Sequence, residues 1–92
     1  MDHDHVRHVE LTVMELAAKQ VGVPATDLTR ATHFRDDLNF DSLDFVDLTM
    51  ALEESFGLTI SDADAEPLQT VGAVVDYVAE RTRSAAAPAT GK

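Results

Sequence analysis

Ser42 is the residue of this sequence best placed to do chemistry, because acids flank it at the start of an apolar, helix-periodic stretch. Asp41-Ser42-Leu43-Asp44 matches a capping box, with Asp in place of the usual Glu or Gln at the third helical position. If Ser42 is the N-cap, its hydroxyl accepts a backbone N–H, and the local pattern favours this assignment. If Asp41 is the N-cap, Ser42 is the first helical residue. Its free hydroxyl then lies at the positive end of the helix dipole, where a phosphate ester would be favoured.

Other catalytic or metal-binding uses of the polar residues are disfavoured by their positions. A serine nucleophile needs a base and a third, orienting group, yet none of the four histidines has a spacing tied to Ser42. The His-Asp-His alternation at 3–5 is typical of a solvated terminus rather than of a metal site. Asp62 and Asp64 have the spacing of the first two ligands of a calcium-binding loop. Pro67, however, follows where such a loop needs a glycine and further oxygen ligands. We expect neither a hydrolase nor a metal centre.

The stretch from Ser42 to Phe56 predicts a helix with two apolar faces rather than one. One face is expected to pack in the core and holds Phe45, Leu48, Thr49, Leu52 and Phe56. The other face mixes apolar and acidic side chains at the spacing of helical neighbours, and it holds Leu43, Val46, Asp47, Met50 and Glu54. Because an unpaired buried carboxylate is costly, this second face is unsuited to a core and suited to a partner protein.

The composition indicates one small domain, since 92 residues with 45% hydrophobic content can bury a single modest core. Cysteine is absent, which excludes disulfides and cysteine-based nucleophiles or zinc sites. The N-terminus is polar and no long apolar run follows, so we expect no signal peptide, no membrane insertion and a cytoplasmic location. We also expect a monomer. A formal net charge of −10 argues against nucleic acid and anionic membranes as partners.

The acids gather in the middle of the chain, where no Lys or Arg accompanies them. Within residues 36–80 the acids lie at positions 36, 37, 41, 44, 47, 53, 54, 62, 64, 66, 76 and 80. We interpret this block as a surface for basic partners, because it cannot neutralise itself. A solubilising surface would carry the same charge, as would an unmodified acidic interaction module that mimics a polyanion and inhibits a basic protein.

Helices are expected to position these residues, because no segment alternates as a strand does. Periodicity predicts helices over about 5–20, 42–56, 61–66 and 71–81, with Asp2 or Asp4 as the first cap and Thr70 as the last. The expected fold is all-α, a small antiparallel four-helix bundle of three longer helices and one short one over residues 1–83. An Ala-rich tail at 84–92 has nothing large to bury and is expected to be disordered.

The connection between the first two helices is unusually long for so small a domain. Leu28, Phe34 and Leu38 are its expected inward anchors. A loop of this length is either functional or contains a short helical turn. Thr26 and Asp27 are candidates to start such a turn.

From Phe34 to Tyr77 the sequence resembles an acyl carrier protein. The resemblance rests on Asp41-Ser42-Leu43-Asp44, on Met50-Ala51-Leu52-Glu53-Glu54-Ser55-Phe56, on Ile60 and on Thr70-Val71-Gly72-Ala73-Val74-Val75-Asp76-Tyr77-Val78. The tripeptide at 41–43 alone would be weak. Its offsets to the later segments, the four-helix layout and the acidic centre make the resemblance specific, and with them it covers all of the chain except the tail.

The resemblance implies that Ser42, preceded by Asp41 as the cap, carries 4′-phosphopantetheine added from coenzyme A by a phosphopantetheinyl transferase. The thiol of this arm would hold acyl groups as thioesters for fatty acid or polyketide synthesis, and the chain itself would not be an enzyme. The second helix would dock onto basic-surfaced acyl-transfer, condensing and reducing enzymes through Leu43, Asp44, Val46, Asp47, Met50 and Glu54. The acyl chain would lie against Phe45, Thr49 and Ile60.

The sequence departs from the family pattern in three places: at Asn39-Phe40, in the bulk of Phe40 and Phe45, and in the Ala-rich tail, which has no counterpart in the short carriers. Asn39-Phe40 stands where a glycine and a smaller residue are often found. Asn tolerates a left-handed backbone better than most residues, so the turn is expected to survive. Phe40 and Phe45 add bulk on either side of Ser42, which bears on how an acyl chain enters the core. An aminoacyl carrier is disfavoured by the acid before Ser42 and by the acidic surface.

Overall fold

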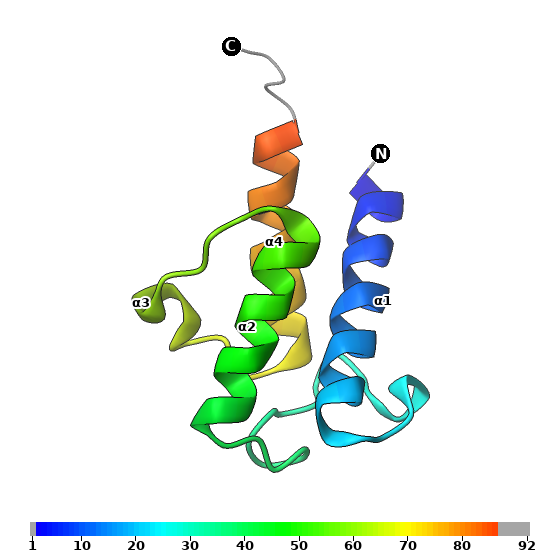
Figure 1. Ribbon diagram of the computed structural model, residues 1–92. Helices are drawn as coiled ribbons and strands as arrows, with labels where there is room; N and C mark the ends of the chain where they lie inside the picture. Colours follow the sequence, from blue (N-terminus) through cyan, green and yellow to red (C-terminus); the bar gives the residue numbers. More distant parts are fainter. Residues whose placement is uncertain (1, 87–92) are drawn as a thin grey trace.

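The computed structural model describes residues 2–86, with side chains from 4 to 82. The elements are α1 (Asp2–Val21), the 3-10 helix η1 (Ala25–Asp27), α2 (Ser42–Phe56), the short α3 (Asp62–Ala65) and α4 (Val71–Ala86) (Figure 1). Within this part of the chain no strand is present, and one isolated bridge joins His33 to Thr70. The predicted all-α class is confirmed, and η1 supplies the helical turn expected in the long connection.

Both terminal helices are longer than the sequence predicted. Asp2 and Asp4 lie inside α1, so neither caps it in the way we expected. Acids in the first turn suit the positive end of the helix dipole, which explains why α1 begins so early. The last helix continues beyond Arg81 to Ala86, through alanines of high helix propensity. The first three positions of the predicted tail are therefore helical. The rest of that tail, at 87–92, lies outside the described residues, and the domain limit at 83 stays a prediction.

Three further helix ends are capped by local side-chain or backbone chemistry, and Thr70 confirms the predicted cap of the last helix. The Ser61 side chain accepts a hydrogen bond from the Asp64 N–H at 3.1 Å and so caps α3. Thr70 Oγ1 accepts from the Ala73 N–H at 3.2 Å at the start of α4. Gly57 ends α2 in the left-handed conformation at φ 66°, which a side chain would disfavour.

The three longer helices lie side by side, with α1 antiparallel to both α2 and α4 (Figure 1). His5 Nε2 lies 2.6 Å from Thr82 Oγ1 on α4, and the His8 ring packs edge-on against Phe56 at the end of α2. The beginning of α1 therefore meets the ends of both other helices, so α2 and α4 run in the same direction. These contacts also correct the expectation of a solvated terminus at His5.

The core lies where α1, α2 and α4 meet. Its fully buried members are Val9, Val13, Ala17, Leu48, Leu52, Val71, Val74, Val75 and Val78. The loop anchors Leu28 and Phe34 are buried as predicted, whereas Leu38 is half-buried. No helix in the described part of the chain is long and apolar enough to cross a membrane.

The long connection between η1 and α2 is fastened to the start of α4. The Val71 N–H donates to the Thr32 carbonyl at 3.0 Å, and the Gly72 N–H donates to the Arg30 carbonyl at 2.8 Å. A Cβ at position 72 would lie 3.0 Å from that same Arg30 oxygen, so this close approach favours glycine. These bonds fix the position of the loop that leads into α2 and Ser42.

Candidate functional site

The turn that leads into α2 is fixed by backbone hydrogen bonds on both sides of Phe34. The Phe34 N–H donates to the Gln69 carbonyl at 3.0 Å, and the Phe40 N–H donates to the Phe34 carbonyl at 2.9 Å. Between them Asn39 adopts the left-handed conformation with φ 59°. Asn thus replaces the glycine expected at such a turn, in agreement with the sequence analysis. The following residue, Phe40, is turned into the core and is buried.

Asp41, not Ser42, is the N-cap of α2. The Asp44 N–H donates to Asp41 Oδ1 at 2.8 Å, and the Asp41 N–H donates to Asp44 Oδ2 at 3.1 Å, which completes a capping box. The assignment favoured by the local pattern is therefore wrong, because the Asp41 carboxylate accepts the bond and adds its charge at the positive end of the helix. Ser42 is the first helical residue and is exposed. Among the described residues none forms a hydrogen bond with its hydroxyl.

The Asp44 carboxylate holds the end of α1 against the start of α2. Gln20 Nε2 donates to Asp44 Oδ1 at 3.1 Å and lies 3.4 Å from Asp47 Oδ2. The backbone N–H of Asp41, followed by the Gln20 amide, lowers the pKa of Asp44 below its usual value. Asp44 therefore stays ionised at neutral pH, but it is less open to partners than the sequence suggested.

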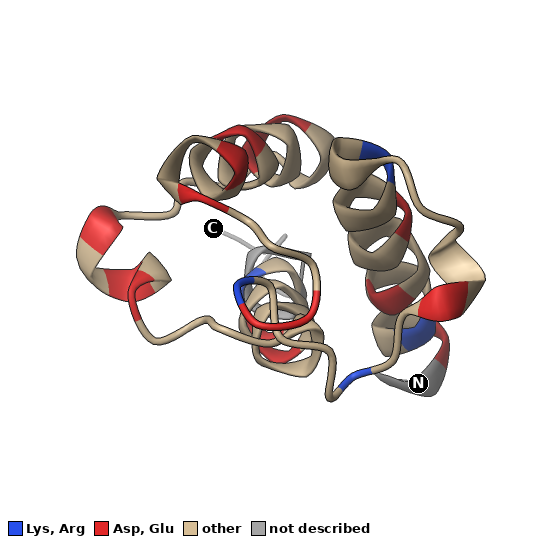
Figure 2. Cartoon of the chain, turned by 90° about the horizontal axis from the view of Figure 1, so that it is seen from below, with Lys and Arg blue, Asp and Glu red and all other residues tan. Residues whose placement is uncertain are grey.

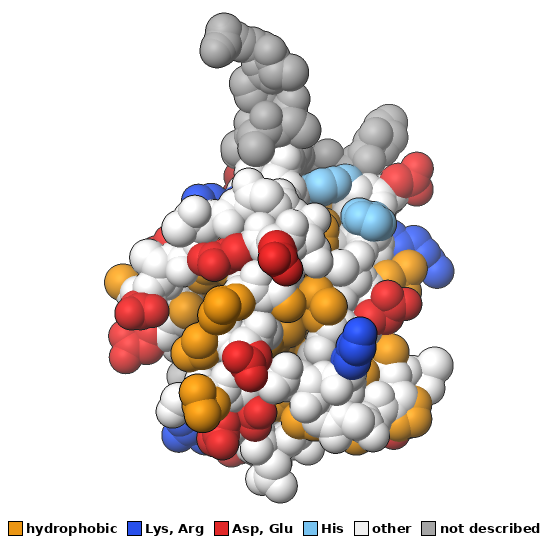
Figure 3. Space-filling view, in the orientation of Figure 1, with side chains coloured by type: hydrophobic (Ala, Val, Ile, Leu, Met, Phe, Trp, Pro, Cys, Tyr) orange, Lys and Arg blue, Asp and Glu red, His pale blue; other side chains and the backbone are white. Residues whose placement is uncertain are grey.

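The two predicted faces of α2 are confirmed as one buried and one exposed. Leu48 and Leu52 are 1% exposed, while Phe45, Thr49 and Phe56 are half-buried. On the opposite side Leu43 is 70%, Met50 59% and Val46 47% exposed. Figure 3 shows hydrophobic and acidic side chains interspersed on the surface over α2. We refer to Leu43, Val46, Asp47, Met50 and Glu54 as the acidic face.

No Lys or Arg of the described residues pairs with the acids of this face, and Figure 2 shows only acids along α2. Elsewhere in the acidic block, cations from outside it do reach in. Arg30 Nη2 lies 2.6 Å from Asp76 Oδ1, and Arg81 Nη1 lies 3.7 Å from Asp64 Oδ2. These two ion pairs neutralise part of the acidic block near α4, whereas the acids on the exposed side of α2 have no Lys or Arg partner among the described residues.

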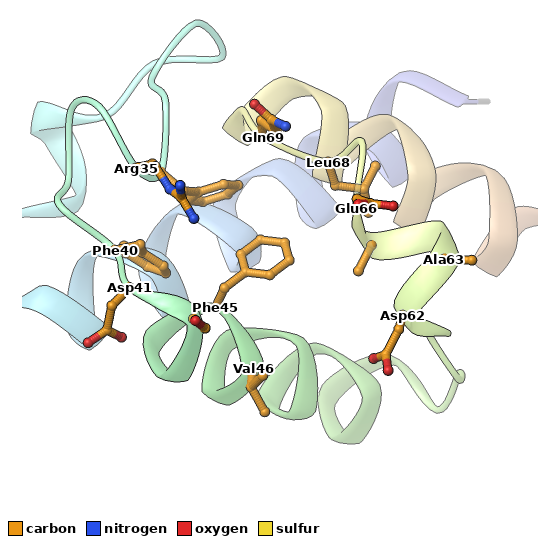
Figure 4. Close-up of a pocket in the computed structure, with 13 residues that line it drawn as sticks. Arg35, Phe40, Asp41, Phe45, Val46, Asp62, Ala63, Glu66, Leu68 and Gln69 are labelled. Carbon is orange, nitrogen blue, oxygen red and sulfur yellow. The ribbon is translucent and has the colours of Figure 1, made fainter.

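A cavity of about 620 Å³ opens beside Ser42, between the start of α2 and the α3 segment. Its aromatic wall is formed by Phe34, whose ring centre lies 5.2 Å from that of Phe40 and 5.6 Å from that of Phe45 (Figure 4). Leu68 and Ala65 line the α3 side, Asp41 and Ser42 line it at the start of α2, and Arg35 extends into it from the preceding loop (Figure 4).

Of the three side chains expected to line an acyl chain, Phe45 lines this cavity, whereas Thr49 and Ile60 do not. The Thr49 hydroxyl donates to the Val46 carbonyl at 2.8 Å, one turn earlier on α2. Ile60 is buried, and its N–H donates to Glu53 Oε2 at 2.7 Å. Phe34, Leu68 and Arg35 also line the cavity, although the sequence indicated only an inward position for Phe34 and no lining role for any of them. Only tertiary packing brings these three into the cavity that adjoins Ser42.

Comparison with known proteins agrees with this arrangement. The family model for the phosphopantetheine attachment site matches residues 12–78. The structure of the acyl carrier protein from Enterococcus faecalis superimposes with a TM-score of 0.71 at 36% identity, over 82% of this chain and 95% of that one. A solution structure from Anaplasma phagocytophilum, described as a candidate acyl carrier protein, gives 0.73 at 41% identity, over 79% and 86%. The chain belongs to the acyl carrier protein family.

Members of this family carry a covalently attached phosphopantetheine, and the residues of this acyl carrier protein fit such a group. Attachment needs an exposed hydroxyl that is not committed to the fold, and Ser42 has one because Asp41 is the cap. The arm also needs space beside the attachment point, which the adjoining cavity supplies.

Proposed function

We propose that Ser42 is the attachment point of the 4′-phosphopantetheine arm. We further propose that this carrier presents acyl thioesters to the enzymes of fatty acid or polyketide synthesis. It would act as a protein-bound substrate for those enzymes and catalyse no step itself. The observation that carries the proposal is the exposed Ser42 hydroxyl, left without a partner among the described residues, at the first position of a helix capped by the preceding residue.

The chain's own residues have two tasks at this site. Asp41 and Asp44 close the capping box, so the start of α2 stays helical while the Ser42 hydroxyl is available. Phe34, Phe40 and Phe45 line an apolar space beside it, which can exclude water from a cargo. When bound, the arm supplies the thiol on which acyl groups are held, a group that this cysteine-free chain does not possess.

The acidic face is the proposed docking surface for partner enzymes. Its apolar members, Leu43, Val46 and Met50, are exposed side by side and provide area to bury in a complex. Asp47 and Glu54 lie among them without a cation from the described residues, so they can steer and orient a basic surface. The phosphopantetheinyl transferase and the acyl-transfer, condensing and reducing enzymes are the proposed partners.

The test is to incubate the apo protein with coenzyme A and a broad-specificity phosphopantetheinyl transferase, and then to measure its intact mass. We expect a single phosphopantetheine increment that disappears in Ser42→Ala. Ser55→Ala is the matched control, because Ser55 is also exposed on α2 and should keep the increment. Failure to gain mass with several such transferases, or an increment that persists in Ser42→Ala, would refute the assignment.

A further inference from the structure

Arg35 is a cation at the rim of the cavity that no described side chain neutralises. It lines the cavity together with Ser42, and Figure 4 shows its guanidinium extending from the loop toward Phe40 and Phe45. Arg30 and Arg81 are already engaged, Arg30 with Asp76 and Arg81 with Asp64 and Tyr77. Arg35 is thus available to bind an anion inside the site.

No ion pair joins Arg35 to the neighbouring acids, and their carboxylates contact His33 instead. Asp37 Oδ2 accepts from the His33 N–H at 2.7 Å, and Asp36 Oδ2 lies 3.9 Å from His33 Nδ1. The Asp41 carboxylate at the same rim is used in the capping box. Each adjacent carboxylate thus has another contact, and Arg35 keeps its charge directed to the cavity.

The backbone of Arg35 is well fixed for such a role. Its carbonyl accepts from the Asn39 N–H at 3.1 Å, and the preceding residue, Phe34, is bonded to Gln69 and Phe40. The two acids that line the opposite wall, Asp62 and Glu66, form no ion pair across the cavity with it. Arg35 is therefore the one cation among the residues that line the cavity, and the other charged lining residues are Asp41, Asp62 and Glu66.

We propose that Arg35 binds the phosphodiester of the prosthetic arm and so holds the first part of the arm against the cavity rim. This proposal rests on attachment at Ser42. A phosphodiester there brings a negative charge close to Asp41 and Asp44, in a chain whose net charge is already −10. A guanidinium pairs with phosphate oxygens in bidentate geometry, so Arg35 offsets this repulsion where a neutral side chain cannot.

The experiment compares the apo and arm-bearing forms of the wild type, Arg35→Gln and Arg7→Gln. Arg7 is an exposed arginine on α1 that does not line the cavity, so Arg7→Gln removes the same charge elsewhere. Arm attachment is first verified by intact mass. The change in Tm on attachment should then be about 2–4 °C less favourable in Arg35→Gln than in the other two proteins, as for an exposed ion pair in a domain of this size. The difference should fade in about 1 M NaCl.

A second readout reports on the contact itself. The 31P resonance of the phosphodiester should shift in Arg35→Gln and stay in place in Arg7→Gln. Equal Tm changes and unshifted resonances in arm-bearing Arg35→Gln would overturn the Arg35 proposal while leaving attachment at Ser42 intact. The same holds if a difference appears only after loading of an acyl group with a terminal carboxylate, since Arg35 would then bind the cargo rather than the arm. If no arm attaches at Ser42, both proposals fall.

Discussion

Asp41→Ala is expected to lower the free energy of unfolding by about 1 kcal/mol. The substitution removes the carboxylate that accepts the Asp44 N–H at 2.8 Å, while the reciprocal bond from the residue 41 N–H to Asp44 survives. Losses of N-cap residues cost about 0.5–2 kcal/mol. Because Asp41 is exposed and one of the two bonds remains, the middle of that range applies.

Urea unfolding followed by circular dichroism measures this effect directly. With a slope of about 1 kcal/mol per molar urea for a chain of this size, the midpoint should fall by about 1 M. Asp41→Asn is the matched control, because Asn caps helices about as well as Asp and keeps the side-chain acceptor. The free energy of unfolding of Asp41→Asn should lie within about 0.5 kcal/mol of the wild-type value.

Asp41→Ala should also affect the site itself. Without the Asp41 carboxylate, Ser42 becomes the nearest side chain that can accept an N–H of the first turn, which would occupy its hydroxyl. The rate of arm attachment should therefore fall in Asp41→Ala and be retained in Asp41→Asn. Unfolding of Asp41→Ala at the wild-type midpoint, with an unchanged slope, would refute the capping argument. Equal destabilisation by both variants would assign the effect to charge rather than to the cap.

Two further predictions concern the acids of α2. The double variant Asp47→Lys, Glu54→Lys should lower kcat/KM for a partner transferase roughly tenfold at low salt. The control double variant Glu15→Lys, Asp27→Lys should leave kcat/KM unchanged. An equal loss in both variants would mean that docking occurs elsewhere. For Asp44, a lowered folded-state pKa means that its stabilisation is present above the usual carboxyl pKa and is lost as the pH falls through the lowered value. The gap in unfolding free energy between wild type and Asp44→Asn should therefore close on acidification, and a gap independent of pH would contradict this linkage.

The parts of the fold that local chemistry determines could be predicted from the sequence. The buried and exposed faces of α2 follow from the spacing of Leu48 and Leu52 against Leu43 and Met50, and the structure confirms them. The caps Ser61 and Thr70 bond their own first turns, so their signals lie within four residues. Asn39 has the left-handed conformation that its side chain tolerates.

The remaining features depend on contacts between distant segments. His5 meets Thr82, 77 residues later, and no local pattern at the N-terminus indicates this bond. The cavity walls also depend on contacts between distant segments. The Phe34 ring contacts Phe45 from a loop whose backbone is hydrogen-bonded to Gln69. The family resemblance places Thr49 and Ile60 at the acyl chain, a prediction that stands, although neither lines the cavity beside Ser42. Sequence spacing could not decide whether Asp41 or the adjacent Ser42 is the N-cap of α2.

The contacts of His5 with Thr82 and of His8 with Phe56 bear on how this carrier can be joined to something else. They gather the beginning of α1 and the ends of α2 and α4 at one pole of the molecule. Ser42 lies at the other end of α2, about 20 Å away at the rise of an α-helix. A tag, a surface linker or a neighbouring domain connected through α1 or α4 would leave the reactive pole unobstructed. If Ser42 carries the arm as proposed, a domain that pivots about its tethered pole would direct that arm toward one enzyme after another.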